Sequence, residues 1–344
     1  MERGCRYYLS NGQKRDRTFD LLKLYAMLSV VLDHALEHMI GGTIQSTQLY
    51  NWIFLSQMPI FMFASGYFAS SGIYKKLSIC DYLKKLGKTV TSLFIPFVSF
   101  AIIVSILNGD NIVFKSILHP EYSLWFLWTL LWMQIIMLTA QQVTKCFVKA
   151  EWLIIFVSIG FYFIGLVPVG VLYIKLPTLF QSKLIIFYSI FYLFGYFYSF
   201  MERNIIILKN DKFRVVCISV MFVVVAFVMI THPTVMYDSE TIINIAFRFI
   251  GSFAATLLML YVMSFVVRIK WCETIAAFGV LSLEMYYIHL LFIRLPFFNS
   301  VGASPIIFVA KYLLLVCISI VTILTLKRHW IPDLIFFGKL PAKK

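Results

Sequence analysis

The chain has 344 residues, of which 61% are hydrophobic and only 13% are charged. About a quarter of the residues in a soluble domain are charged, so this composition excludes an ordinary water-soluble fold. The net charge of +14 would suggest nucleic-acid binding in a soluble protein, and its meaning here depends on where the basic residues lie.

The apolar residues are gathered into blocks of membrane-spanning length. A bilayer core about 30 Å thick needs roughly 20 apolar residues per helix. We therefore predict an all-α, polytopic membrane bundle of about ten transmembrane helices. The ten blocks, of which the seventh is short, lie at about 21–40, 50–70, 89–107, 124–143, 152–170, 184–200, 215–230, 243–267, 275–293 and 305–326.

The basic residues give the predicted orientation of these spans. If the N-terminus is cytoplasmic, 23 of the 30 lysine and arginine residues fall in cytoplasmic segments and 4 fall outside. Because cytoplasmic loops are enriched in these residues, both termini are predicted to be cytoplasmic. The basic excess is thus an orientation signal, which argues against a nucleic-acid partner.

The blocks follow one another without a linker, a low-complexity segment or a clear internal repeat. We therefore predict a single membrane domain over 1–344, with a core at 17–326 and no separate soluble domain. The segment Ile73–Lys88 mixes lysines with apolar residues, which fits either an amphipathic surface helix or a solvated loop. The six cysteines lack metal-ligand spacing, so neither a disulfide framework nor a metal site is predicted.

The first span carries the densest set of ionisable residues, which are costly in a membrane and often functional. Lys23 and His34 are eleven positions apart, which places them about 20° from a common helix face and about 16 Å apart along the axis. Asp20 and Lys23 could equally anchor the span at the interface, and Glu37 and His38 could lie at the outer water boundary. The set comprises Asp20, Lys23, Asp33, His34, Glu37 and His38.

His34 is the candidate general base, because imidazole accepts a hydroxyl proton near neutral pH. A nearby carboxylate would hold its tautomer. Asp33 is adjacent in sequence and therefore points about 100° away, whereas Glu37 at i+3 reaches the ring more easily. A carboxylate from another span, such as Glu284, is a further candidate.

The late spans hold three other candidates, Arg248, Glu284 and His289. An arginine within a span needs a carboxylate or a wet cavity. These residues and His34 could converge on one hydrated chamber, although Arg248 could also form a structural ion pair and His289 could be hydrogen-bonded within the bundle.

Four motifs in order resemble those of the acyltransferase 3 family of membrane enzymes, which O-acetylate bacterial surface polysaccharides. The first joins Asp20, Lys23 and His34, and the second is a Phe-rich segment that ends in Ser65-Gly66-Tyr67. The third is Leu-Trp-Phe-Leu at 124–127, and the fourth is the Tyr-x-x-His segment that ends at His289. The resemblance covers roughly 17–326 and fits the shorter members that lack an appended soluble domain.

The chain departs from the family pattern in its basic residues. Lys23 stands where the family often has arginine, and the usual arginine pair before Ile95-Pro96 is missing. Lysine binds phosphate without the bidentate fork of arginine, so the donor is expected to be held differently or less tightly.

The resemblance implies an O-acyltransferase of the bacterial cell membrane that moves an acetyl or similar group from cytoplasmic acetyl-CoA or another acyl-CoA. The acceptor would be a hydroxyl of a glycan or of a lipid-linked saccharide. The implied catalytic residues are His34, Asp33 and Glu284. The implied donor-binding residues are Arg17, Lys23, Lys84, Lys85 and Lys88, and the implied substrate-binding residues are Ser65, Tyr67, Arg248 and His289.

Several of these residues also have structural interpretations. Ser65-Gly66 could permit close helix packing, and Tyr67 is typical of an interfacial aromatic belt. The same intramembrane charges would also serve a transporter or flippase of a lipid-linked sugar. A non-catalytic membrane partner in envelope assembly is a third hypothesis.

Overall fold

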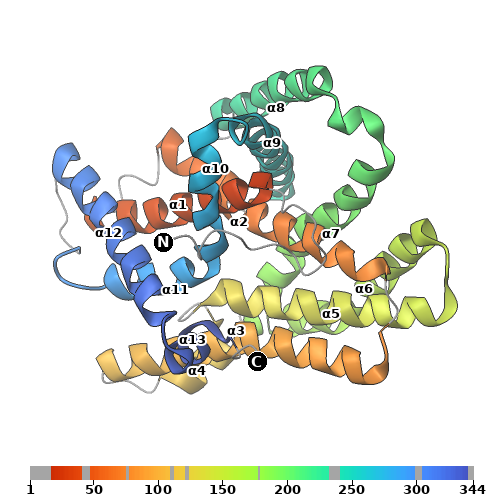
Figure 1. Cartoon of the computed structure of the whole chain (residues 1–344), viewed down its shortest axis with the longest axis horizontal. Helices are drawn as coiled ribbons and strands as arrows, with labels where there is room; N and C mark the ends of the chain where they lie inside the picture. The colour runs from red at the N-terminus through yellow and green to blue at the C-terminus, as the bar shows by residue number, and fades with distance from the viewer. Residues whose placement is uncertain are drawn as a thin grey trace. The chain divides into compact units, whose positions relative to one another are not determined.

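The structure is a computed structural model that describes 17–40, 47–74, 77–108, 112–120, 124–176, 179–231, 241–298 and 304–339. Within these ranges every regular element is a helix and no strand occurs (Figure 1). The predicted all-α class is confirmed. The chain ends fall in 1–16 and 340–344, outside the described residues, so the cytoplasmic placement of the termini stays a prediction.

Nine helices in the described part of the chain are long and apolar enough to cross a membrane. The remaining predicted span, at 21–40, corresponds to α1 (Arg17–Met39), whose 23 residues suffice in length but include five Asp, Glu, Lys or Arg side chains. The architecture is therefore a polytopic membrane bundle. The apolar helices are α2 (Gln48–Ala69), α3 (Ile79–Asn108), α5 (Trp125–Phe147), α6 (Glu151–Lys175), α7 (Ser182–Asn204), α8 (Asp211–Thr231), α9 (Ile242–Val266), the interrupted span α10 (Lys270–Ala276) to α11 (Ser282–Phe292), and α12 (Pro305–Leu326).

Helix α3 begins ten residues before the predicted apolar block, at Ile79. Ser78 caps it, because the Ser78 hydroxyl accepts from the Asp81 amide at 3.1 Å and donates to the Asp81 carboxylate at 2.8 Å. The end of the Ile73–Lys88 segment is therefore the first part of α3, and Lys75 and Lys76 lie outside the described residues. Two short helices, α4 (Ile112–Leu118) and α13 (Trp330–Phe337), were not predicted.

The ninth predicted span is two helices joined by the 3-10 segment η6 (Ala277–Leu281). Gly279 in η6 lies against the backbone of α1, where a Cβ atom would be only 1.8 Å from the Asp20 carbonyl oxygen. Only glycine permits this approach, which holds α11 beside α1. The predicted span at 275–293 falls almost entirely within Lys270–Phe292, which is long and apolar enough to cross a membrane, and η6 interrupts the α-helix inside it.

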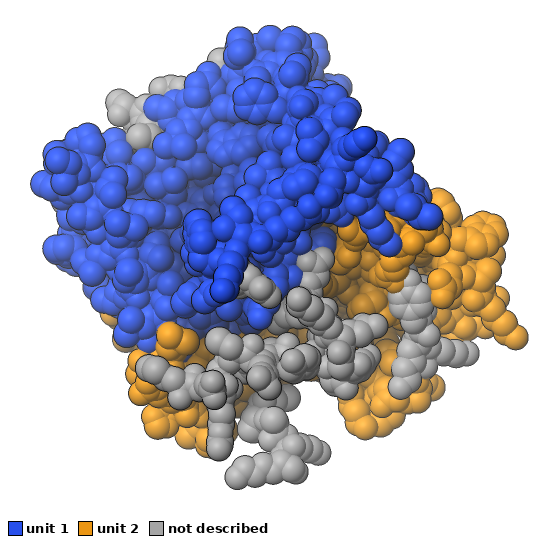
Figure 2. Space-filling view, turned by 45° about the horizontal axis from the view of Figure 1, so that its top comes forward, with its two compact units in different colours: residues 1–61, 205–323 blue, residues 62–204, 324–344 orange. Residues whose placement is uncertain are grey.

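The chain forms two compact units, residues 1–61 with 205–323 and residues 62–204 with 324–344 (Figure 2). We call them unit 1 and unit 2. Two of the three boundaries fall inside α2 and α12 and the third directly follows α7, and neither unit is a continuous piece of sequence. The single domain over 1–344 stays a prediction.

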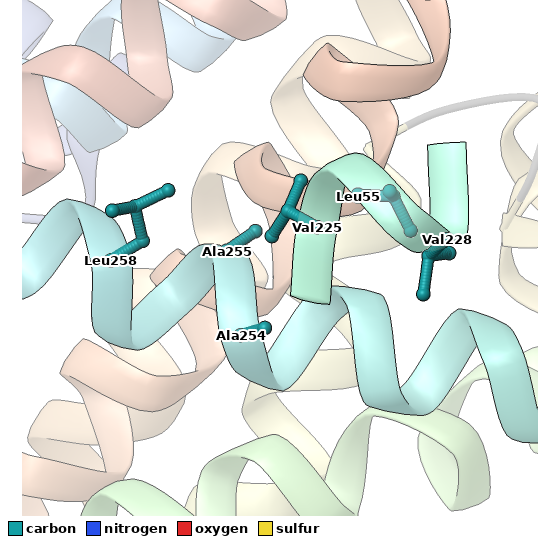
Figure 3. Close-up of a cluster of buried hydrophobic side chains, with 6 residues drawn as sticks. All are labelled: Leu55, Val225, Val228, Ala254, Ala255 and Leu258. Atoms are coloured by element: carbon teal, nitrogen blue, oxygen red, sulfur yellow. The ribbon is translucent and has the colours of Figure 1, made fainter. Parts of the chain in front are cut away.

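In unit 1, helices α8 and α9 pack against each other and against α2. Small side chains on α9 face valines of α8, which lets the two backbones come close (Figure 3). Leu55 of α2 completes the contact. The buried cluster consists of Leu55, Val225, Val228, Ala254, Ala255 and Leu258.

Replacing Gly279 by alanine should destabilise the protein, because the new Cβ atom would meet the α1 backbone. We expect Gly279→Ala to lower the free energy of unfolding by about 1–3 kcal/mol, as for other overpacked positions. Thermal unfolding in detergent would measure the change. Gly160→Ala is the matched control, since nothing lies within 4 Å of its Cβ position, and equal stability of the two variants would contradict the contact.

Candidate active site

His34 of α1 and His289 of α11 lie side by side in unit 1. Their ring centroids are 5.5 Å apart and the ring planes are inclined by 32°. The His34 side chain is 29% exposed, whereas His289 is fully buried. The structure thus brings together two predicted site residues from opposite ends of the sequence.

The hydrogen bond of His289 determines what its ring can do. Its Nδ1 is 2.7 Å from the carbonyl oxygen of Met285. A carbonyl oxygen only accepts, so Nδ1 carries the proton and Nε2 of the neutral ring has a lone pair. Nε2 is buried and has no hydrogen-bond partner among the described residues. Neutral His289 is therefore suited to accept a hydrogen bond from a hydroxyl and not to donate one to an oxyanion.

Glu37 lies beside the Nδ1 atom of the His34 ring. Its Oε2 is 3.6 Å from His34 Nδ1, and its Oε1 accepts a 2.8 Å hydrogen bond from the Tyr50 hydroxyl. Tyr50 begins the buried part of α2 and was not predicted as a site residue. Tyr50 stands at the end of an apolar block, where tyrosines often lie at the membrane interface. The pattern of apolar residues therefore gave no reason to single it out as a site residue.

Asp33 is turned toward α2. Its Oδ2 accepts a 2.8 Å hydrogen bond from the Gln57 amide, and its side chain is buried. Oδ1 has no hydrogen-bond partner among the described residues. Gln57 was also missed, although a glutamine within an apolar block is a signal that could have identified it.

Arg248 of α9 lies over an aromatic ring of α2. Its guanidinium carbon lies 5.1 Å from the centroid of the Phe54 ring, and Phe54 stacks on Tyr50 at 6.1 Å. Glu284 is buried in the first turn of α11. It precedes His289 by five residues, so the two side chains leave the helix about 140° apart.

At the start of α1, Lys23 lies 3.2 Å from the carboxylate of Asp20, which is fully buried. Removing one partner of a buried ion pair leaves an uncompensated charge. Lys23 therefore stabilises α1 whatever else it binds. Arg17 is the first residue of the helix and is partly exposed.

The remaining predicted residues belong to unit 2. The Tyr67 hydroxyl donates to Glu202 at 2.7 Å. Ser65 precedes Gly66, where a Cβ atom would be 1.8 Å from the Tyr192 carbonyl oxygen, so this motif permits the close packing of α2 on α7.

The three lysines of α3 are exposed, but their surroundings differ. Lys85 Nζ is 3.3 Å from the Cβ position of Gly72, and Lys145 of α5 donates to the Gly72 carbonyl. Two ammonium groups therefore meet at the turn between α2 and α3. Lys84 and Lys88 are the other two lysines.

No group of three His, Cys, Asp or Glu side chains in the described ranges is arranged to hold a metal ion. In unit 1, the two imidazoles can accept protons, and the carboxylates can hold an imidazole ring in place. This arrangement is suited to acid–base chemistry on a hydroxyl group.

Comparison with protein families found a match to an acyltransferase domain, the acyltransferase 3 model, over residues 16–327. No curated protein and no solved structure gave a significant match. The matched region covers nearly the whole chain and includes both histidines. The chain therefore belongs to the acyltransferase 3 family of multi-pass membrane proteins.

Proposed function

We propose that the protein moves an acetyl or similar acyl group from cytoplasmic acyl-CoA to a hydroxyl of a surface glycan or its lipid-linked precursor. It would act in the bacterial cell membrane. The observation that carries the proposal is the pairing of His34 with His289 inside the region that matches the acyltransferase family. Family membership favours acyl transfer over the transporter hypothesis, because a transporter would leave its substrate unmodified.

In the proposed reaction, His34 Nε2 takes the proton of the acceptor hydroxyl. The hydroxyl oxygen attacks the thioester carbonyl carbon, and a new C–O bond forms. The tetrahedral intermediate collapses as the C–S bond breaks, and the CoA thiolate takes the proton from the His34 imidazolium. The products are the glycan ester and CoA.

The other residues have proposed roles on the two substrates. Arg248 carries a permanent charge, which suits it to stabilise the oxyanion or to bind the sugar. His289, with its Nε2 lone pair, would accept a hydrogen bond from an acceptor hydroxyl. Ser65 and Tyr67 remain proposed substrate residues, and Asp33 and Glu284 remain proposed catalytic residues.

On the donor side, basic residues would bind the CoA phosphates as point charges. The proposed set is Arg17, Lys23, Lys84, Lys85 and Lys88. Lys85 lies near Lys145, and two neighbouring cations attract a phosphate more strongly than one. This supports assigning to Lys85 the largest contribution to binding of the donor phosphates.

His34→Ala should reduce acyl transfer by about 10²- to 10⁴-fold, the usual contribution of a general base. The measurement is CoA release and glycan acylation by the detergent-purified protein, supplied with acetyl-CoA and an envelope glycan extract. His38→Ala, one turn further along α1, is the matched control and should retain most of the activity. Activity of His34→Ala near that of the wild type would remove His34 from the mechanism.

Lys85→Gln should raise the KM for acetyl-CoA by about two- to fivefold, the effect expected of an exposed charge. The difference from wild type should shrink as salt is added, because salt screens exposed charges. Lys149→Gln, which changes another exposed lysine of unit 2, should leave the KM unchanged. An equal effect of both variants, or an effect on acceptor KM only, would contradict the donor assignment.

A further inference from the structure

Two carboxylates flank His34 on α1, and the structure distinguishes them. Asp33 precedes the histidine and directs Oδ2 to Gln57 of α2 at 2.8 Å. Glu37 follows by one turn and places Oε2 3.6 Å from His34 Nδ1. The ring therefore has Glu37, and not the adjacent Asp33, as its carboxylate neighbour.

Tyr50 restricts the freedom of the Glu37 side chain. Its hydroxyl donates to Oε1 at 2.8 Å, which leaves Oε2 facing the imidazole. Tyr50 is itself buried and stacked on Phe54, so the ring that carries the hydroxyl is held in place. A carboxylate that is about one-third exposed, and would otherwise sample many rotamers, is thereby held beside one ring nitrogen.

We propose that Glu37, held by Tyr50, is the positioning residue of His34 and keeps the proton of the neutral ring on Nδ1. Nε2 then has the lone pair that removes the acceptor proton. Once His34 is protonated, the same carboxylate faces the positive charge. This inference rests on the proposed function, since it assigns a partner to the proposed base.

The 3.6 Å separation fits such a role. It exceeds the range of a good hydrogen bond but lies within ion-pair reach. Catalytic hydrogen bonds are often long without substrate and shorten in the reacting complex. Both side chains are about one-third exposed, so each has room for that small movement.

Glu37→Gln tests the proposal by reversing the polarity beside Nδ1. A glutamine amide can donate to Nδ1, which would move the ring proton to Nε2 and remove the base from the reactive side. We expect kcat to fall by about 10²-fold, with little change in the KM for acetyl-CoA. Tyr50→Phe should reduce kcat by about three- to tenfold, because it removes one hydrogen bond from the carboxylate.

The double variant separates positioning from general structural support. Because Tyr50 acts through Glu37, adding Tyr50→Phe to Glu37→Gln should cause almost no further loss. Asp33→Asn keeps an oxygen that can accept from Gln57 and should lose less activity than Glu37→Gln. Independent, multiplying losses, or a larger loss for Asp33→Asn than for Glu37→Gln, would overturn the proposal.

Nitrogen-15 NMR of histidine-labelled full-length protein in detergent gives a readout that does not depend on activity. The His34 signal, assigned by its loss in His34→Ala, should report the Nδ1–H tautomer in the wild type and a shift toward Nε2–H in Glu37→Gln. An identical tautomer in both proteins would overturn the positioning role. If the tautomer shifts as expected but no acyl-CoA is consumed by the wild type, the proposed function fails while the contact stands.

Discussion

The backbone of η6 rests directly on the backbone of α1, and the placement of the histidines depends on that contact. A side chain at Gly279 would collide with the Asp20 carbonyl, so the approach is available only to glycine. The same segment interrupts the ninth span and starts α11 beside α1, which sets His289 against His34. A small local feature thus determines the geometry of the candidate site.

Helix α1 combines a structural task with a chemical one. Each of its buried or half-buried acids has a partner: Asp20 has Lys23, Asp33 has Gln57, and Glu37 has Tyr50. Polar groups in an apolar bundle cost several kcal/mol when they lack partners, so these contacts allow a charged helix to stay within the bundle. They also fix the rotamers on either side of His34, which is the preorganisation that acid–base catalysis requires.

Much of the fold could be predicted because apolar length directly reports membrane-spanning helices. The interruption at η6 could not be predicted from the sequence, because it depends on a backbone contact between segments far apart in the chain. On α1, the helical period correctly turned Asp33 away from His34 and placed Glu37 in reach of the ring. The contact of Tyr50 with Glu37 was missed because it joins two helices, and the pattern of either helix holds no information about such a contact. Gln57 was missed although a glutamine within an apolar block could have identified it.

The central claim is that the protein forms an ester from acyl-CoA, and transfer of label tests it most directly. Purified protein in proteoliposomes would receive acetyl-CoA labelled in the acetyl group together with an envelope glycan extract. The account predicts label bound to glycan, an equal release of CoA, and recovery of the label as acetate after mild alkali, which cleaves O-acetyl esters. Glycan that crosses the bilayer unmodified, with no transfer of label from any acyl-CoA, would contradict the account and favour transport.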